Sequence, residues 1–368
     1  MSSVIARSQA TKQSRCGCAL GPRLLRRFAP RNDSNRLISA CLASLLLYAL
    51  TFGFVFDRPL ALGFLRQQID DKLARAAVIS GPKLVILAGS NGPYSHRCEV
   101  IEPILGMPCV NGGIAVGIGL DYLFARWQRV LHPGDVVYLP MGEAQYARTH
   151  AATDVGPDAA IMFRHDWRTL AALPIERRLA ALFSFDLRAV VMGSIEAALV
   201  AAHFHDPRAE VTGASNAWGD HIGHTAELAS VSRAVLAAAS PYHPSAEQIR
   251  TGYGTALIAT FTRWACTHGV LVIGGLPTGF VDAPMPLATL QAIRSVYAGN
   301  GGDFLVLPNF SRYPRSAFFD TAEHLNETWQ VAHSKLLAEQ LRSHHASIAA
   351  ARPGDPADPP APRNTPTN

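Results

Sequence analysis

The sequence predicts an α/β protein: a three-layer α/β/α sandwich around a mostly parallel sheet, preceded by one N-terminal transmembrane helix. Short, β-branched apolar runs bounded by Gly or Pro, with amphipathic helical segments between them, predict the sandwich. An uncharged stretch of twenty residues at 37–56 predicts the membrane helix. A chain of 368 residues with 48% hydrophobic content can bury a core of this size.

The chain begins with a basic leader, residues 1–36. It holds eight Lys or Arg and only Asp33, about +7 net, so the total of +5 leaves about −2 for the remaining chain. The basic charge therefore does not indicate a nucleic-acid partner.

The stretch 37–56, "LISACLASLLLYALTFGFVF", has the length of a bilayer span, and the arginines that precede it predict a cytoplasmic N-terminus. The main domain would then face outward. A cleaved signal peptide and a buried core helix are the alternatives.

The remaining elements follow in order. Residues 57–78 are expected to form a helical connector, and residues 79–350 the main domain. The predicted strands of this domain are "KLVILAG" (83–89), "DVVYLPM" (135–141), "GVLVIGGLP" (269–277) and "DFLVLPN" (303–309). Amphipathic helices are predicted at 119–131, 249–269 and 324–345. Residues from about 150 to 245 are interpreted as an inserted lid, and the Pro-rich residues 351–368 as a disordered tail.

The cysteines form no recognisable framework. Three of the six, Cys98, Cys109 and Cys266, lie in the main body, and no paired Cys-x-x-Cys metal motif is present. A bridge between Cys98 and Cys109 is one interpretation. The favoured interpretation is three isolated small core residues.

A nucleophile is expected where the first predicted strand ends. Ligands bind at the carboxyl ends of parallel strands, and this strand delivers Gly89, Ser90 and Asn91. Glycine permits a tight turn that exposes the following serine. The stretch "AGSNG" differs from a Gly-x-Ser-x-Gly nucleophile elbow only by Ala88.

The partners of a serine nucleophile occur far downstream, in "FFDTAEHLNETW". A serine hydroxyl needs a histidine to take its proton, and that histidine needs a carboxylate to fix its tautomer. Ser90, His324 and Asp320 supply these three roles. The alternative is that Asp320 and Thr321 cap the last helix and His324 is an ordinary first-turn residue.

The blocks "GSN", "VNGG" and "DTAEHLN" occur in this order, and residues 83–140 and 304–341 together resemble the SGNH (GDSL-like) hydrolase superfamily. They are most similar to its membrane-anchored branch in bacterial exopolysaccharide O-acetylation, with relatives in alginate and cellulose acetylation and in teichoic-acid D-alanylation. The resemblance implies an SGNH/flavodoxin-like fold in the periplasm, anchored in the inner membrane. It also implies a Ser-His-Asp triad.

The resemblance implies an oxyanion site too. The second turn would bring N–H groups of Asn111, Gly112, Gly113 or Gly117 towards the oxyanion, and Asn91 is a further candidate for oxyanion or substrate binding. Two departures stand out. Asp320 and His324 are four positions apart rather than three, and Gly142 and Glu143 stand where the third block supplies an asparagine. Glu143 is therefore the substrate-binding candidate of that block.

The loop "NAWGDHIGHT" holds Asn216 and Trp218, which are predicted to line a sugar-binding cleft. The expected function is acyl-ester hydrolysis or O-acetyl transfer on an exopolysaccharide, cellulose being one polymer the family suggests. The alternative is a non-catalytic partner of the same fold that binds a glycan or an acyltransferase. A membrane-bound O-acyltransferase and a polysaccharide synthase are the implied partners, and no cofactor, metal or nucleic acid is expected.

Overall fold

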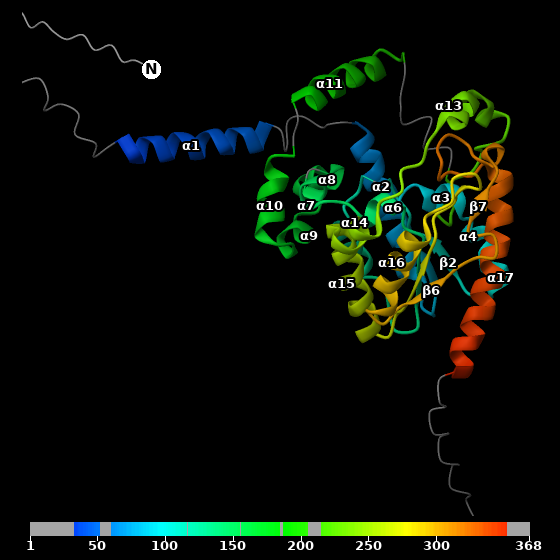
Figure 1. Cartoon of the computed structure of the whole chain (residues 1–368). Coiled ribbons are helices and arrows are strands. Elements are labelled where there is room, and N and C mark those ends of the chain that lie inside the picture. Colours follow the sequence, from blue (N-terminus) through cyan, green and yellow to red (C-terminus); the bar gives the residue numbers. More distant parts are fainter. Residues whose placement is uncertain are drawn as a thin grey trace, which may run out of the picture. The chain divides into compact units, whose positions relative to one another are not determined.

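A computed structural model describes residues 33–51, 60–115, 117–154, 156–184, 187–204 and 215–351 (Figure 1). The chain divides into two compact units, Met1–Leu50 and Thr51–Asn368, and each is described by itself. Most of the predicted leader, residues 1–32, lies outside the described residues. So does the predicted tail from residue 352 onward.

In the first unit the described chain forms one helix, α1 (Asp33–Leu50). Of the helices described, none is both long and apolar enough to cross a membrane. The helix predicted over 37–56 is therefore not found as such. Helix α1 opens with the polar residues Asp33, Asn35 and Arg36, and residues 52–56 of the predicted span lie outside the described part of the chain.

The second unit is built on a five-stranded sheet with strand order β2-β1-β3-β4-β6. Its strands are β1 (Leu84–Ile86), β2 (Cys109–Asn111), β3 (Val136–Leu139), β4 (Leu271–Gly275) and β6 (Asp303–Leu305). All four strand pairs are parallel, as in the pairing of Leu84 with Cys109 on one side and Val136 on the other. The four predicted strands are thus confirmed, and the chain is an α/β protein. A separate parallel pair is formed by β5 (Gly279–Phe280) and β7 (Arg312–Tyr313).

The described helices of this unit follow in chain order. They are α2 (Leu60–Val78), α3 (Asn91–Ser95), α4 (Cys98–Leu105), α5 (Leu120–Trp127), α6 (Glu143–Tyr146), α7 (His150–Asp154), α8 (Pro157–His165), α9 (Trp167–Ala172), α10 (Ile175–Leu182), α11 (Leu187–Ala201), α13 (Arg233–Ala238), α14 (Ala246–Thr251), α15 (Tyr253–Thr267), α16 (Leu287–Ala298) and α17 (Glu327–Ala351), with 3-10 turns η2 (Leu228–Ser232) and η3 (Arg315–Ala317). Between residues 150 and 245 the described chain is helical or irregular, apart from one isolated bridge between Ser215 and His221.

Helices cover both faces of the sheet (Figure 1). Alternate strand residues such as Ile86 and Tyr138 share one buried cluster with Ile101 of α4 and Leu337 of α17. On the opposite face, a side chain added at Gly274 would collide with Tyr297, so α16 lies directly against the strand there. Because both faces are covered, the strands are continuous apolar runs, which is why the sequence reveals them.

Helix α2, the predicted connector, packs on the rest of the second unit. It contacts β2 and α8, and its residues Ile69, Leu73 and Ala76 are buried. A protein fragment that begins at residue 79, the predicted start of the main domain, would therefore lack α2 and lose this packing.

The favoured prediction for the cysteines is wrong. Cys98, the first residue of α4, and Cys109, the first of β2, form a disulfide with Cα atoms 5.2 Å apart. Helix α4 turns back along β2, which places the two residues side by side, and their spacing in sequence does not reveal this. Cys266 is free and exposed rather than a core residue.

Candidate active site

Ser90, His324 and Asp320 meet in the structure. The Ser90 Oγ lies 2.8 Å from His324 Nε2, and His324 Nδ1 lies 2.7 Å from Asp320 Oδ1. Ser90 stands between β1 and α3, whereas Asp320 and His324 lie in the loop before α17, which begins at Glu327. The alternative in which Asp320 caps the first turn of that helix is therefore wrong.

The loop that carries Asp320 and His324 is closed by backbone pairing. Phe318 and Leu325 form an antiparallel bridge, and the Phe319 N–H donates to the His324 carbonyl at 2.8 Å. The Asn326 N–H donates to the Ala317 carbonyl, also at 2.8 Å. This closed loop fixes both side chains relative to Ser90. Asp320 and His324 therefore form the contacts with each other and with Ser90 although they are four residues apart rather than three.

The hydrogen bonds assign the tautomer of His324. A carboxylate can only accept, so Nδ1–H donates to Asp320, and Nε2 of the neutral ring accepts from the Ser90 hydroxyl. Burial alone would raise the pKa of Asp320, but its hydrogen bond with His324, the electrostatic interaction with that ring and backbone hydrogen bonds outweigh burial and leave this pKa below its ordinary value. Asp320 therefore stays ionised and orients the histidine.

A cavity of about 390 Å³ opens beside the triad, and both Ser90 and His324 line it. The other lining residues come from the segment of His324 and from four further segments of the chain. They are Glu143, Ala144, Pro241, Tyr242, His243, Thr278, Gly279, Phe280, Ala283, Arg312, Thr321, Ala322 and Glu323. A volume of this order is within the range of small-molecule sites.

Charged groups gather in this cavity. His243 Nδ1 lies 2.8 Å from Glu143 Oε2, and Arg312 Nη2 lies 3.8 Å from Glu143 Oε1. Burial raises the pKa of Glu143, although His243 and Arg312 oppose the shift. Arg312 Nη2 is buried and has no hydrogen-bond partner among the described residues. The cavity thus holds a cation with an unused donor.

Glu323 is a second carboxyl group in the cavity, next to His324 in sequence. Its carboxyl oxygens pack against Gly142, where an added Cβ would come within 3.0 Å. Burial raises the pKa of Glu323 to about 7; Glu143 adds to the shift, and His324 and Arg312 oppose it. This group therefore changes charge near neutral pH.

Two of the predicted oxyanion residues have a structural role. The Asn91 side chain is buried and donates to the Pro140 carbonyl at 2.7 Å. The Asn111 side chain is fully buried, and its Nδ2 donates to the Gly92 and His96 carbonyls and to Asp220 Oδ1. These two amides hold the turns together and do not reach the cavity beside Ser90.

The prediction that the second turn offers free N–H groups is wrong for Asn111, Gly112 and Gly113, and the Asn111 N–H donates to the Trp218 carbonyl at 2.9 Å. Gly112 N–H donates to the Ile86 carbonyl at 2.8 Å, Gly113 N–H to Asn111 Oδ1 at 3.3 Å, and Ile114 N–H to the Ala88 carbonyl at 3.2 Å. Gly113 instead lets this turn approach the nucleophile turn, since a Cβ there would lie 2.8 Å from the Gly92 Cα. Gly117 lies beside Pro157 and does not line the cavity.

At Gly142 and Glu143, where the family has an oxyanion asparagine, the structure also differs from that arrangement. The Gly142 N–H donates to Gln145 Oε1 at 2.9 Å, and Gly142 is the N-cap residue of α6. Glu143 reaches the cavity, but His243 occupies its carboxylate. Glu143 thus lies at the site as predicted. Its carboxylate is a hydrogen-bond acceptor, whereas the family's asparagine would supply an amide donor.

Asn216 and Trp218 lie away from the cavity of Ser90. Trp218 Nε1 donates to Glu102 at 2.8 Å, and the Arg75 guanidinium stacks on its ring with the carbon 5.1 Å from the ring centroid. The Asn216 amide donates to Asp220 at 3.1 Å. The indole is already covered, so the predicted stacking of a sugar on Trp218 is not available.

Sequence reasoning missed four residues around the triad: Tyr94, His243, Arg312 and Glu323. The signal for Tyr94 was its position four residues after Ser90, on the short helix α3 that follows this serine, and that for Glu323 its place beside His324. His243 comes from a loop and Arg312 from the short strand β7, and neither segment carries a motif.

No known family model matches the chain, and no curated protein sequence is significantly similar to it.

Proposed function

We propose that the protein is a serine acyl-ester hydrolase or O-acyltransferase in which Ser90 is the nucleophile, His324 the general base and Asp320 the residue that orients it. The observation that carries the proposal is the continuous pair of hydrogen bonds from Ser90 through His324 to Asp320, at 2.8 and 2.7 Å. Both reacting groups face a cavity large enough for an acyl ester.

The chemistry follows from these positions. Ser90 Oγ attacks the ester carbonyl carbon while its proton passes to His324 Nε2, and Asp320 stabilises the imidazolium. The leaving alkoxide takes that proton, and the acyl group remains on Ser90. Water or a sugar hydroxyl, deprotonated by His324, then attacks the acyl-serine and restores the free enzyme.

Two groups are proposed to stabilise the oxyanion. The backbone N–H of Ser90 has no acceptor among the described residues, and it precedes the first turn of α3. Arg312 lines the same cavity, and its buried Nη2 has no hydrogen-bond partner among the described residues. A cation near the developing charge can replace a missing amide donor.

We further propose an SGNH/flavodoxin-like three-layer sandwich of the exopolysaccharide O-acetylation branch. The strand order β2-β1-β3-β4-β6, with Ser90 directly after β1, supports this assignment. The Cys98–Cys109 disulfide supports a compartment outside the cytoplasm, because disulfides persist in oxidising environments. Attachment to the inner membrane through residues 37–56, the polymer, and an acyltransferase partner stay predictions of the sequence.

A non-catalytic glycan- or acyltransferase-binding partner is the second candidate. The observation that favours it is the third block, where no side-chain amide faces the cavity and Glu143 is held by His243. Losing one oxyanion donor typically lowers turnover by about 10²- to 10³-fold.

The test is hydrolysis of p-nitrophenyl acetate by the full-length protein in mild detergent, which keeps α2 packed on β2. Ser90→Ala and His324→Ala are compared with Ser295→Ala and His132→Ala, which change exposed residues outside the cavity. We expect the first pair to lose activity and the controls to keep it.

Unchanged hydrolysis by folded Ser90→Ala would overturn the nucleophile assignment. A folded parent protein that hydrolyses no acetyl ester would favour the binding partner instead.

A further inference from the structure

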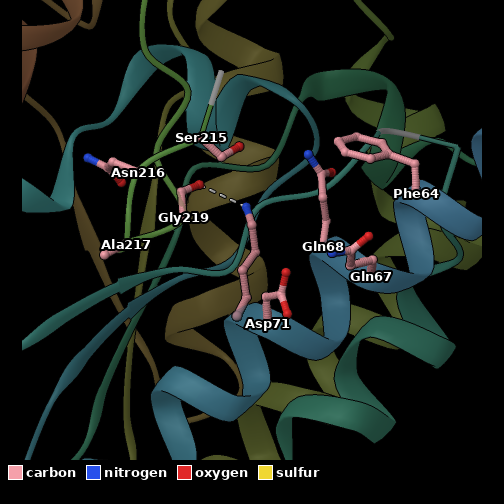
Figure 2. A pocket seen from close by; sticks show the side chains of 9 residues that line it. Phe64, Gln67, Gln68, Asp71, Ser215, Asn216, Ala217 and Gly219 are labelled. Carbon is pink, nitrogen blue, oxygen red and sulfur yellow. Dashed lines mark hydrogen bonds between the residues drawn. The ribbon is translucent and has the colours of Figure 1, made fainter. Parts of the chain in front are cut away.

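A second cavity, also of about 390 Å³, lies between α2 and the loop 215–219 (Figure 2). It shares no lining residue with the cavity of Ser90. Its lining comes from one face of α2 and from the loop that precedes Asp220. The lining residues are Phe64, Gln67, Gln68, Asp71, Lys72, Ser215, Asn216, Ala217 and Gly219.

The α2 wall is a polar stripe beside the buried face of the helix, in which Gln67 and Asp71 are exposed and Gln68 is half-buried. Phe64, Gln67, Gln68 and Asp71 follow the i, i+3, i+4, i+7 spacing, so they share one side of the helix. Among the described residues, no hydrogen bond occupies the side chains of Gln67, Gln68 or Asp71. Their polar atoms are therefore available to a ligand.

Lys72 forms the floor of this cavity. Lys72 as a whole is only 6% exposed, and its Nζ donates to the Gly113 carbonyl at 2.6 Å and the Gly219 carbonyl at 3.0 Å. An ammonium has three donors, so one remains without an acceptor in the described part of the chain. Burial lowers the pKa of Lys72 to about 7, with Asp220 opposing the shift.

The opposite wall adds a hydroxyl and backbone. Figure 2 shows Ser215 and Gly219 facing α2, with the Asn216 side chain turned away. Asn216 is bonded to Asp220, consistent with that direction. Phe64 supplies the one aromatic surface. The site thus combines two free amides, a carboxylate, a hydroxyl and an amine with one ring.

We propose that this second cavity binds a neutral sugar unit of a glycan. Glutamine amides can donate and accept at once, as adjacent sugar hydroxyls require, and Asp71 adds acceptors. Asp71 and Lys72 carry opposite charges, so the cavity offers no net attraction for an anionic ligand. Phe64 can pack against the C–H face of a sugar ring.

The cavity is linked to the nucleophile turn through Lys72. Its bond to the Gly113 carbonyl holds the second turn, and Gly113 lies against Gly92 just after Ser90. A sugar that accepts from Lys72 would therefore bind behind the turn that positions the nucleophile. This inference does not depend on catalysis by Ser90.

The test measures binding by isothermal titration calorimetry with the full-length Ser90→Ala variant, so that turnover and failure of the proposed function cannot affect it. The probes are the neutral oligomers cellotetraose and maltotetraose, with tetragalacturonate as the anionic comparison. We expect at least one neutral oligomer to bind, with a Kd of about 1 mM or tighter. Adding Gln67→Ala and Gln68→Ala together should weaken binding at least about tenfold.

The matched control is Gln291→Ala, an exposed glutamine on α16 that lines neither cavity. It should leave the Kd unchanged. The proposal is overturned if neither neutral oligomer binds at about 10 mM, if only tetragalacturonate binds, or if the double variant binds as tightly as the control.

Discussion

The phenol ring of Tyr94 lies flat against the imidazole of His324, with ring centroids 4.2 Å apart and planes inclined by 10°. The other face of Tyr94 is covered by His221, at 4.0 Å and 19°. Tyr94 therefore fixes the plane of the base as Asp320 fixes its tautomer. A stacked aromatic pair contributes about 0.5–1.5 kcal/mol beyond its buried area.

Removing this ring should lower turnover. We expect Tyr94→Ala to reduce kcat about 2- to 10-fold, the rate equivalent of that stacking energy, with KM for p-nitrophenyl acetate nearly unchanged. Tyr94→Phe keeps the stack and should stay within about twofold of the parent. Steady-state kinetics on both variants checks this, and equal rates for the two would show that Tyr94 does not position His324.

Glu323 should make the free energy of unfolding depend on pH. Its pKa rises from 4.5 to about 7 on folding, so between these values the folded protein keeps a proton that the unfolded chain has lost. Stability is then fully present below about pH 4.5 and falls as pH rises towards 7. In Glu323→Gln, the loss of unfolding free energy between about pH 4.5 and pH 7 should be smaller than in the parent by about 1–3 kcal/mol.

Urea unfolding of the parent and of Glu323→Gln at about pH 4 and about pH 8, either side of this window, measures the difference. Glu247→Gln, at an exposed glutamate, is the control. A variant whose pH dependence equals that of the parent would contradict the assignment of this carboxyl.

Lys83 and Asp135 form an ion pair whose side chains are both fully buried, with Nζ and Oδ2 2.7 Å apart. Lys83→Met leaves the carboxylate without its counter-ion and should lower the free energy of unfolding by about 3–5 kcal/mol. The exposed pair Arg250–Glu247 offers the comparison, and Arg250→Met should cost at most about 1 kcal/mol. Denaturant unfolding of both variants tests the contrast, and similar losses would argue against it.

The Cys98–Cys109 disulfide closes a short loop with a sequence separation of 11. Replacing both cysteines by serine should lower the free energy of unfolding by about 3 kcal/mol, chiefly because the unfolded chain regains freedom. Urea titrations of the double variant and the parent, with and without a thiol reductant, measure this. If reductant destabilises the variant as much as the parent, the effect does not come from this bond.

Much of the fold could be predicted because buried parallel strands are unbroken apolar runs, and the triad because Ser90, Asp320 and His324 each lie in a distinctive local block. The oxyanion donors could not. Whether the Gly112 N–H is free depends on its bond to the Ile86 carbonyl, which is a property of the sheet edge.

The approach of Arg312 to the cavity was hidden for a different reason. Phe310 and Ser311 before it both have left-handed backbone, with φ of 53° and 55°. Sequence reasoning expects glycine or asparagine in that conformation, so the tight turn that delivers Arg312 carries no recognisable signal.

Ser90 and His324, the proposed nucleophile and base, stand 234 positions apart in the chain. During synthesis, the segment with Ser90 emerges long before the one with His324, and until the latter docks the serine has no proton acceptor. Under the proposed function, the growing polypeptide would therefore not react with esters until the final part of the domain is complete. Truncated translation products that end before His324 would contain Ser90 without its proposed base.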